Sequence, residues 1–164
     1  MVNLTLVLPS GPRPGGSAER TDLDDFPTLI MVTCDLLGET DCRFRAGGFG
    51  HDEWAVDVSY DLSTLMEQLP DALSGLRAGE PSEIDLYGQG LERTLYFSPD
   101  GVWVDIECRS RTSWTPAPAV VRQGKDALVE MLEKLARDFA EAVAIGVPEL
   151  ADEEVFALWR RGQI

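Results

Sequence analysis

The sequence predicts an α+β fold: a mainly antiparallel, curved sheet of about six to seven strands, with helices packed on one of its faces. Short segments of alternating polarity are separated by turns rich in glycine and proline. Two longer segments repeat apolar residues at three- and four-residue steps, as helices do. The strand candidates follow one another through short turns, which is typical of antiparallel neighbours. The expected order is β-βββ-α-βββ-α(α), within a single domain of residues 1–164.

The N-terminal part is expected to supply four strands, at residues 3–8, 29–37, 41–46 and 53–59. Residues 9–27 are crowded with Pro, Gly, Ser and Asp and show no period, which indicates a long loop. A turn at 38–40 should join the second and third strands into a hairpin. The glycines of residues 47–50 then supply a flexible turn before the fourth strand.

A helix is predicted over residues 61–79, because six leucines and methionines in this segment share one helical face. Asp61 or Ser63 can cap its start, and Gly79 follows as a C-terminal stop. Pro70 interrupts the pattern, so a kink or a division into two short helices is expected.

Three further strands are predicted at residues 83–87, 92–98 and 102–110. The last two are joined by Ser98-Pro99-Asp100-Gly101, where proline, aspartate and glycine each suit a position of a tight turn. These two strands must therefore be antiparallel neighbours.

The C-terminal part is expected to be helical. Residues 125–145 carry a continuous apolar stripe, and Gly146 ends the pattern. A second, short helix is expected within residues 148–162, where Phe156 and Trp159 form an apolar face. This terminal helix should dock on the body of the domain.

The net charge restricts the possible partners. The chain has 29 acidic and 14 basic residues, a formal net charge of -15. Such a field repels nucleic acid and anionic membranes, and it favours a basic protein as partner. The apolar stretches are far shorter than the roughly 18 residues of a membrane span. We therefore expect no nucleic-acid and no membrane partner, although the charge can equally serve solubility alone.

The cysteines indicate a reducing compartment. Cys34, Cys42 and Cys108 are odd in number, lack CxxC spacing and lie in apolar segments, so buried thiols are expected. Residues 1–9 lack the positive region that opens a secretory signal. A cytoplasmic location is the simplest expectation.

No residue pattern predicts catalysis, a metal or a cofactor. The sole histidine, His51, lies in a turn without a GxSxG motif or another nucleophile motif, and the glycines around it lack the GxxxxGK[ST] pattern. The acidic cluster Asp22, Asp24 and Asp25 lacks the glycine and distal glutamate of an EF-hand. A non-catalytic protein is favoured, while acid-base chemistry by Asp105 remains an alternative.

A binding surface is predicted from strand alternation. Trp103, Asp105 and Glu107 are two residues apart, so they share one face of a sheet. Aromatic anchors surrounded by acids suit the binding of a basic protein. The predicted partner-binding residues are Asp57, Asp85, Tyr87, Tyr96, Trp103, Asp105 and Glu107. The alternative is that a helix covers this face and that Trp103 belongs to the core.

A strongly acidic α+β domain without catalytic motifs resembles the immunity proteins of bacterial polymorphic toxin systems. The resemblance extends over residues 29–145 and depends on Asp57, Asp85, Trp103, Asp105, Glu107 and the 98–101 hairpin. It implies a non-catalytic module that occludes a basic toxin or enzyme without any cofactor.

Three other functions remain open at this point. A small-molecule-binding or regulatory domain would enclose a pocket between the sheet and the 62–76 helix. A carboxylate enzyme would depend on Asp105 or Asp57. A structural subunit would associate through Phe156 and Trp159. The sequence does not decide the oligomeric state.

Overall fold

The computed structural model describes residues 1–15, 23–88 and 90–164 of the chain. It confirms the α+β class, with two antiparallel sheets in the described part. The helices are α1 (Phe26–Leu37), α2 (Ser63–Ala78), α3 (Lys125–Gly146) and α4 (Glu154–Arg160). The strands are β1 (Asn3–Val7), β2 (Arg43–Gly47), β3 (Ser82–Leu86), β4 (Arg93–Asp100), β5 (Trp103–Ser110) and β6 (Val120–Gly124). A π-helical turn, η1 (Val58–Leu62), precedes α2, and a 3-10 turn, η2 (Pro148–Leu150), follows α3.

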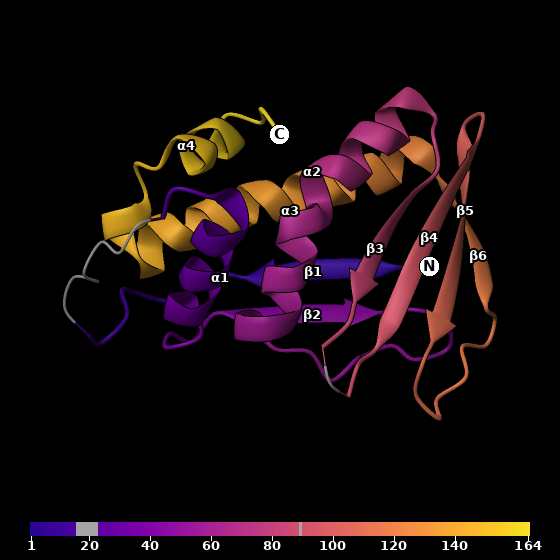
Figure 1. Ribbon diagram of the computed structural model, residues 1–164, viewed down its shortest axis with the longest axis horizontal. Coiled ribbons are helices and arrows are strands. Elements are labelled where there is room, and N and C mark those ends of the chain that lie inside the picture. Colours follow the sequence, from indigo (N-terminus) through magenta and orange to yellow (C-terminus); the bar gives the residue numbers. More distant parts are fainter. Residues whose placement is uncertain (16–22, 89) are drawn as a thin grey trace.

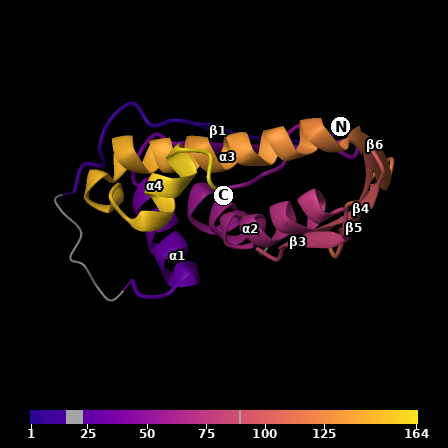
Figure 2. The ribbon, with the colours of Figure 1, turned by 90° about the horizontal axis from the view of Figure 1, so that it is seen from above.

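The strands divide into a β1-β2 pair and a meander in the order β3-β4-β5-β6. Helix α3 runs along the length of the molecule and packs against β1, α2 and α4 (Figure 1). Seen from above, α2 and α3 lie on the same side of the curved meander, and no described helix lies on its other side (Figure 2). The prediction of helices on one face is therefore confirmed for this sheet, whereas the single sheet of six to seven strands is wrong.

Residues 29–37 form most of helix α1 instead of the expected strand. The Asp25 carboxylate accepts a hydrogen bond from the Thr28 backbone N–H at 2.9 Å, and Pro27 lies in the first turn. Both are strong helix-start signals, and they outweigh the β-branched composition of the segment. The expected 29–46 hairpin is consequently absent, and β2 pairs with β1 in the register Thr5 to Arg45.

Residues 53–59 were also expected as a strand and are not one. The Trp54 N–H donates to the Ala46 carbonyl at 2.8 Å, but the chain then separates from β2 and enters η1 at Val58. Without these two strands the order becomes β-α-β-α-ββββ-α-α, with the turns η1 and η2 added.

The later elements agree better with their predictions. Helix α2 is a single helix with Pro70 in its interior, and Gly79 adopts a left-handed φ of 74° after it. The β4-β5 turn lies at residues 101–102, slightly beyond the expected 98–101. Strand β6 was not predicted at all. The predicted loop 9–27 includes residues 16–22, which lie outside the described ranges.

The core is continuous between the inner face of the meander, α2 and α3. The C-terminal helix α4 packs on α3, with the Phe139 ring 5.8 Å from Phe156 and 6.0 Å from Trp159. The three cysteines are free and buried. Burial raises the pKa of Cys42 and of Cys108 to about 11, so both are protonated and unreactive at neutral pH. Within the described ranges, no helix combines the length and apolar character needed to cross a bilayer.

Candidate functional site

One face of the meander carries most of the predicted binding residues. In β5, Val104, Ile106 and Cys108 are buried, while the alternate residues point away from the helices. Trp103 is 48% exposed, so the alternative in which it belongs to the core is wrong. We name this surface the outer face; it comprises Glu83, Asp85, Thr94, Tyr96, Ser98, Asp100, Trp103, Asp105, Glu107, Arg109, Arg111, Val120 and Arg122.

The strand register places the outer-face side chains in cross-strand rows. One row aligns Tyr96, Glu107 and Val120, and a neighbouring row aligns Asp105 with Arg122. Directly opposite residues in antiparallel strands bring their side chains into contact. Aromatic, apolar and charged groups therefore lie next to one another across the outer face.

Asp105 is held by an arginine from the strand that the sequence did not predict. Arg122 donates through Nε and Nη2 to the two Asp105 carboxylate oxygens, each at 2.7 Å. A third hydrogen bond runs from Arg122 to Asp100 at 3.3 Å. Hydrogen bonding to Arg122 lowers the pKa of Asp105 below its ordinary value. This bidentate geometry is the arrangement in which arginine binds carboxylate best.

Glu107 is held in a similar way within β5 itself. Arg109 donates to its two oxygens at 2.7 and 3.1 Å, and these hydrogen bonds lower the pKa of Glu107. The same guanidinium lies 4.5 Å from the ring centroid of Tyr96. The aromatic and charged parts of the outer face are thus joined by a cation-π contact.

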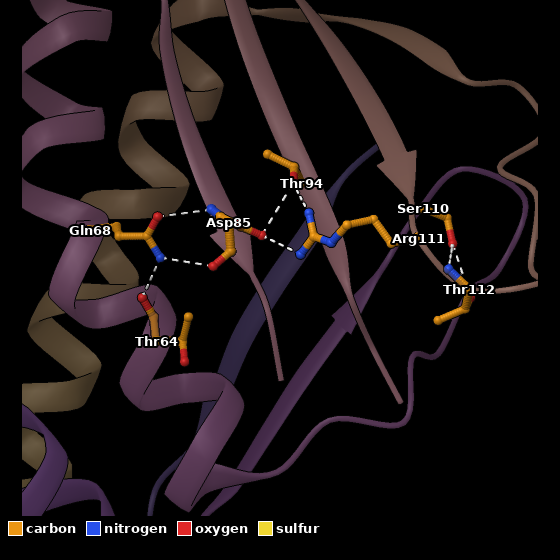
Figure 3. Close-up of polar contacts among 7 residues, drawn as sticks. All are labelled: Thr64, Gln68, Asp85, Thr94, Ser110, Arg111 and Thr112. Atoms are coloured by element: carbon orange, nitrogen blue, oxygen red, sulfur yellow. Dashed lines mark hydrogen bonds and ion pairs between the residues drawn. The ribbon is translucent and has the colours of Figure 1, made fainter. Parts of the chain in front are cut away.

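Asp85 anchors a third network, at the edge of the sheet (Figure 3). Its carboxylate accepts hydrogen bonds from Arg111 at 2.6 Å and from the Thr94 hydroxyl at 3.2 Å. The side-chain amide of Gln68 accepts from the Asp85 N–H at 2.8 Å and donates to its carbonyl at 3.0 Å. Helix α2 thereby occupies the backbone groups of an edge strand with a side chain.

Two predicted residues differ from the others in position. Tyr87 follows β3 directly and is exposed at the margin of the outer face. Asp57 lies elsewhere, beside β2, where its carboxylate accepts the Tyr60 N–H at 2.6 Å and begins η1. The structure therefore brings together Asp85, Tyr96, Trp103, Asp105 and Glu107, and separates Asp57 from them.

The alternation within β5 places Arg109 on the same face as Glu107, so this arginine was predictable from the sequence. Arg111 and Arg122 were not expected on this face. Arg122 gave no such signal, because its strand was not recognised.

Beyond the outer face, a buried arginine occupies the end of the sheet next to residues 48–54. Arg93 is only 5% exposed, and its guanidinium carbon lies 4.6 Å from the Trp54 ring and 3.9 Å from the Trp114 ring. Its Nε and Nη1 atoms have no hydrogen-bond partner among the described residues. Burial lowers the pKa of Arg93, while two tryptophan faces take the place of a carboxylate.

Asp61 gives a pH-dependent prediction. Its side chain is 6% exposed and accepts the Asp57 N–H at 2.9 Å. Burial raises the pKa of Asp61 above its ordinary value of 3.8. The ionised carboxylate is then less favourable in the folded than in the unfolded state, so Asp61→Asn is expected to be the more stable protein at pH 7. The difference should disappear as the pH falls through the folded pKa towards the unfolded one.

Urea unfolding of both proteins between pH 7 and pH 3 measures this difference. The asparagine oxygen can still accept the Asp57 N–H, so the hydrogen bond is conserved. A difference that stays constant over this range would contradict the assignment to Asp61.

Within the described ranges, no three His, Cys, Asp or Glu side chains lie close enough together to hold a metal ion. The chain matches no protein-family model, no curated protein and no solved structure.

Proposed function

We propose that the chain is a non-catalytic protein-binding module whose outer face binds a basic protein, in the manner of an immunity protein or inhibitor that occludes a toxin or enzyme. The observation that supports this function is the uncovered outer face, where Trp103 and Tyr96 lie among fixed ion pairs. Exposed aromatic side chains are unfavourably hydrated, and burial under a partner removes them from water, which favours binding.

The aromatic groups can act as anchors. Trp103 and Val120 are about half exposed, and both come from strands that are paired on the meander. Interface energy concentrates in a few tryptophan, tyrosine and arginine residues that become desolvated on binding. Because the sheet already fixes their positions, little conformational entropy is lost when a partner covers them.

The charges can select the partner. On the outer face, four carboxylates (Asp85, Asp100, Asp105 and Glu107) are held by the arginines Arg109, Arg111 and Arg122. The net charge of -15 lies mostly outside this face and attracts a basic protein from a distance. Close contact would then let lysines or arginines of the partner share carboxylates that are already correctly oriented.

The test is quantitative affinity capture from a lysate of the source organism, with wild type, Trp103→Ala and Met31→Ala as baits. Met31 is 49% exposed on α1 and serves as a matched apolar control away from the outer face. We expect one basic protein to be enriched on the wild type and on Met31→Ala. Its affinity for Trp103→Ala should be about 30-fold lower, since a central tryptophan contributes about 2 kcal/mol or more.

Salt dependence separates steering from anchoring. Association with the captured protein, measured by surface plasmon resonance, should slow as the ionic strength rises, whereas Trp103→Ala should mainly speed dissociation. The proposed function would be refuted if the captured protein bound wild type and Trp103→Ala with equal affinity, or if the captured protein were not basic.

A further inference from the structure

A groove opens between β2 and the segment 53–59, on a different part of the molecule from the outer face. Its volume is about 720 Å³, within the range of roughly 300–1,000 Å³ that is typical of ligand sites. Residues 38–45 form one wall, except Glu39, and residues 53–59 form the other. This groove lies away from the interface between the sheet and α2, where the small-molecule alternative places its pocket.

The wall formed by β2 is a strand edge with which no strand of the described residues pairs, and we call it the free edge of β2. The Ala46 carbonyl points away from β1, because it accepts the hydrogen bond from Trp54. In an antiparallel strand the backbone groups of every second residue point the same way. The N–H and carbonyl of Phe44 therefore point into the groove, since the 53–59 segment leaves β2 after its single hydrogen bond at Ala46.

The side chains along this edge differ between the two faces of β2. Cys42 and Phe44 are buried and form an apolar floor, whereas Arg43 and Arg45 are exposed on the opposite face of β2. Neither arginine forms an ion pair within 4 Å with a carboxylate of the described residues, although Arg43 interacts electrostatically with Asp41, two residues before it. This is notable in a chain with 29 acidic and 14 basic residues, where the outer-face arginines are all paired.

Three carboxylates line the groove: Asp41 on the same wall as the arginines, and Glu53 and Asp57 on the facing wall. Asp41 accepts the Ser10 N–H at 2.8 Å and shares part of the charge of Arg43, so Arg45 is the more available of the two arginines. Asp57 is committed to the N–H groups of Tyr60 and Asp61, at 2.6 and 3.4 Å. Glu53 lies across the groove. A strand added to the edge of β2 would place two of its residues directly opposite Arg43 and Arg45. Residues directly opposite each other in antiparallel strands favour opposite charges, so acidic residues are favoured at these two places.

We propose that this groove binds an extended acidic peptide, which adds to the free edge of β2 as a third strand. Its backbone would exchange hydrogen bonds with Phe44. Acidic side chains would lie beside Arg43 and Arg45, and the residue between them would be apolar and face the floor. Strand addition of this kind draws affinity from the backbone and specificity from alternate side chains. The occupant differs in charge and surface from the basic protein proposed for the outer face.

The experiment selects binders from a displayed library of random peptides of about seven residues, the length of an ordinary strand. The bait is the full-length protein. Enriched peptides should show an acidic-apolar-acidic pattern. Their affinity for wild type, Arg45→Glu and Arg161→Glu is then measured by fluorescence anisotropy. Arg161 is an exposed arginine at the end of α4, so its reversal matches the charge change at a distant place.

Arg45→Glu should weaken binding about fivefold or more, and Arg161→Glu should not. Peptides with lysine in place of the acid should bind Arg45→Glu better than wild type. Bound peptide should also slow hydrogen exchange of the Phe44 amide. The proposal is overturned if no peptide is enriched, if enriched peptides lack acids, if Arg45→Glu binds them normally, or if Phe44 exchange is unchanged. Trp103→Ala should leave peptide binding intact, which separates this result from the outer face.

Discussion

Trp54→Ala is expected to lower the free energy of unfolding by about 4 kcal/mol, as large-to-small changes of buried aromatic residues do. Trp54 is 2% exposed, stacks on Phe49 at 6.4 Å and donates through its indole N–H to the Gly48 carbonyl. It also forms one of the two aromatic walls around Arg93. Removing it opens a cavity and leaves a buried guanidinium with a single cation-π partner, which adds to the loss.

Urea denaturation followed by fluorescence and by circular dichroism measures this loss. Trp103→Ala is the matched control, because it removes the same side chain from an exposed position and should change stability by less than about 1 kcal/mol. If the two variants were equally stable, the packing of Trp54 against Phe49 and Arg93 would not stabilise the fold as described.

The second large effect is expected from Gly50→Ala, at about 3 kcal/mol of destabilisation. Gly50 has a φ of 82°, and a Cβ built on it would lie 2.2 Å from the Ala117 carbonyl oxygen. That contact is backbone, so the 112–118 segment must move away. The hydrogen bond from the Ala117 N–H to the Phe49 carbonyl would be lost with it.

Gly79→Ala separates conformational strain from close approach. Gly79 has a similar φ of 74°, but nothing lies within 4 Å of the position of an added Cβ. Only the left-handed backbone is then penalised, at about 1 kcal/mol. Thermal unfolding of the two variants should therefore differ clearly. Equal midpoints would mean that the 48–51 turn adapts to a side chain without displacing its neighbour.

Strands β3, β4 and β5 and the helices α2 and α3 were predictable because their signals are local, whereas β6 was not. The turn residues near Gly101 and the apolar period of α2 and α3 each specify an element without reference to the rest of the chain. Residues 29–37 were misassigned because a short apolar run fits either period, and Asp25 and Pro27 were attributed to the preceding loop. The β1-β2 pair joins segments separated by α1, and no local pattern indicates such a partner.

The candidate site was predictable to the same extent. Alternation within β5 placed Trp103, Asp105 and Glu107 together, since a strand period depends only on neighbouring residues. The misplacement of Asp57 followed from the strand wrongly assigned to 53–59. The free edge of β2 could not be foreseen, because it exists only where a tertiary segment diverges from a strand.

The packing of β1 on α3 has a consequence for the order of folding. The first strand of the chain buries Leu4 and Leu6, and its neighbour Val2 donates to Gln123 at 3.3 Å, just before the last long helix. During synthesis β3, β4 and β5 can pair through short turns as they emerge, whereas β1 has no complete packing surface until α3 has been made. We therefore expect the docking of β1 against α3 to come late in folding, because it joins segments that lie far apart in the chain.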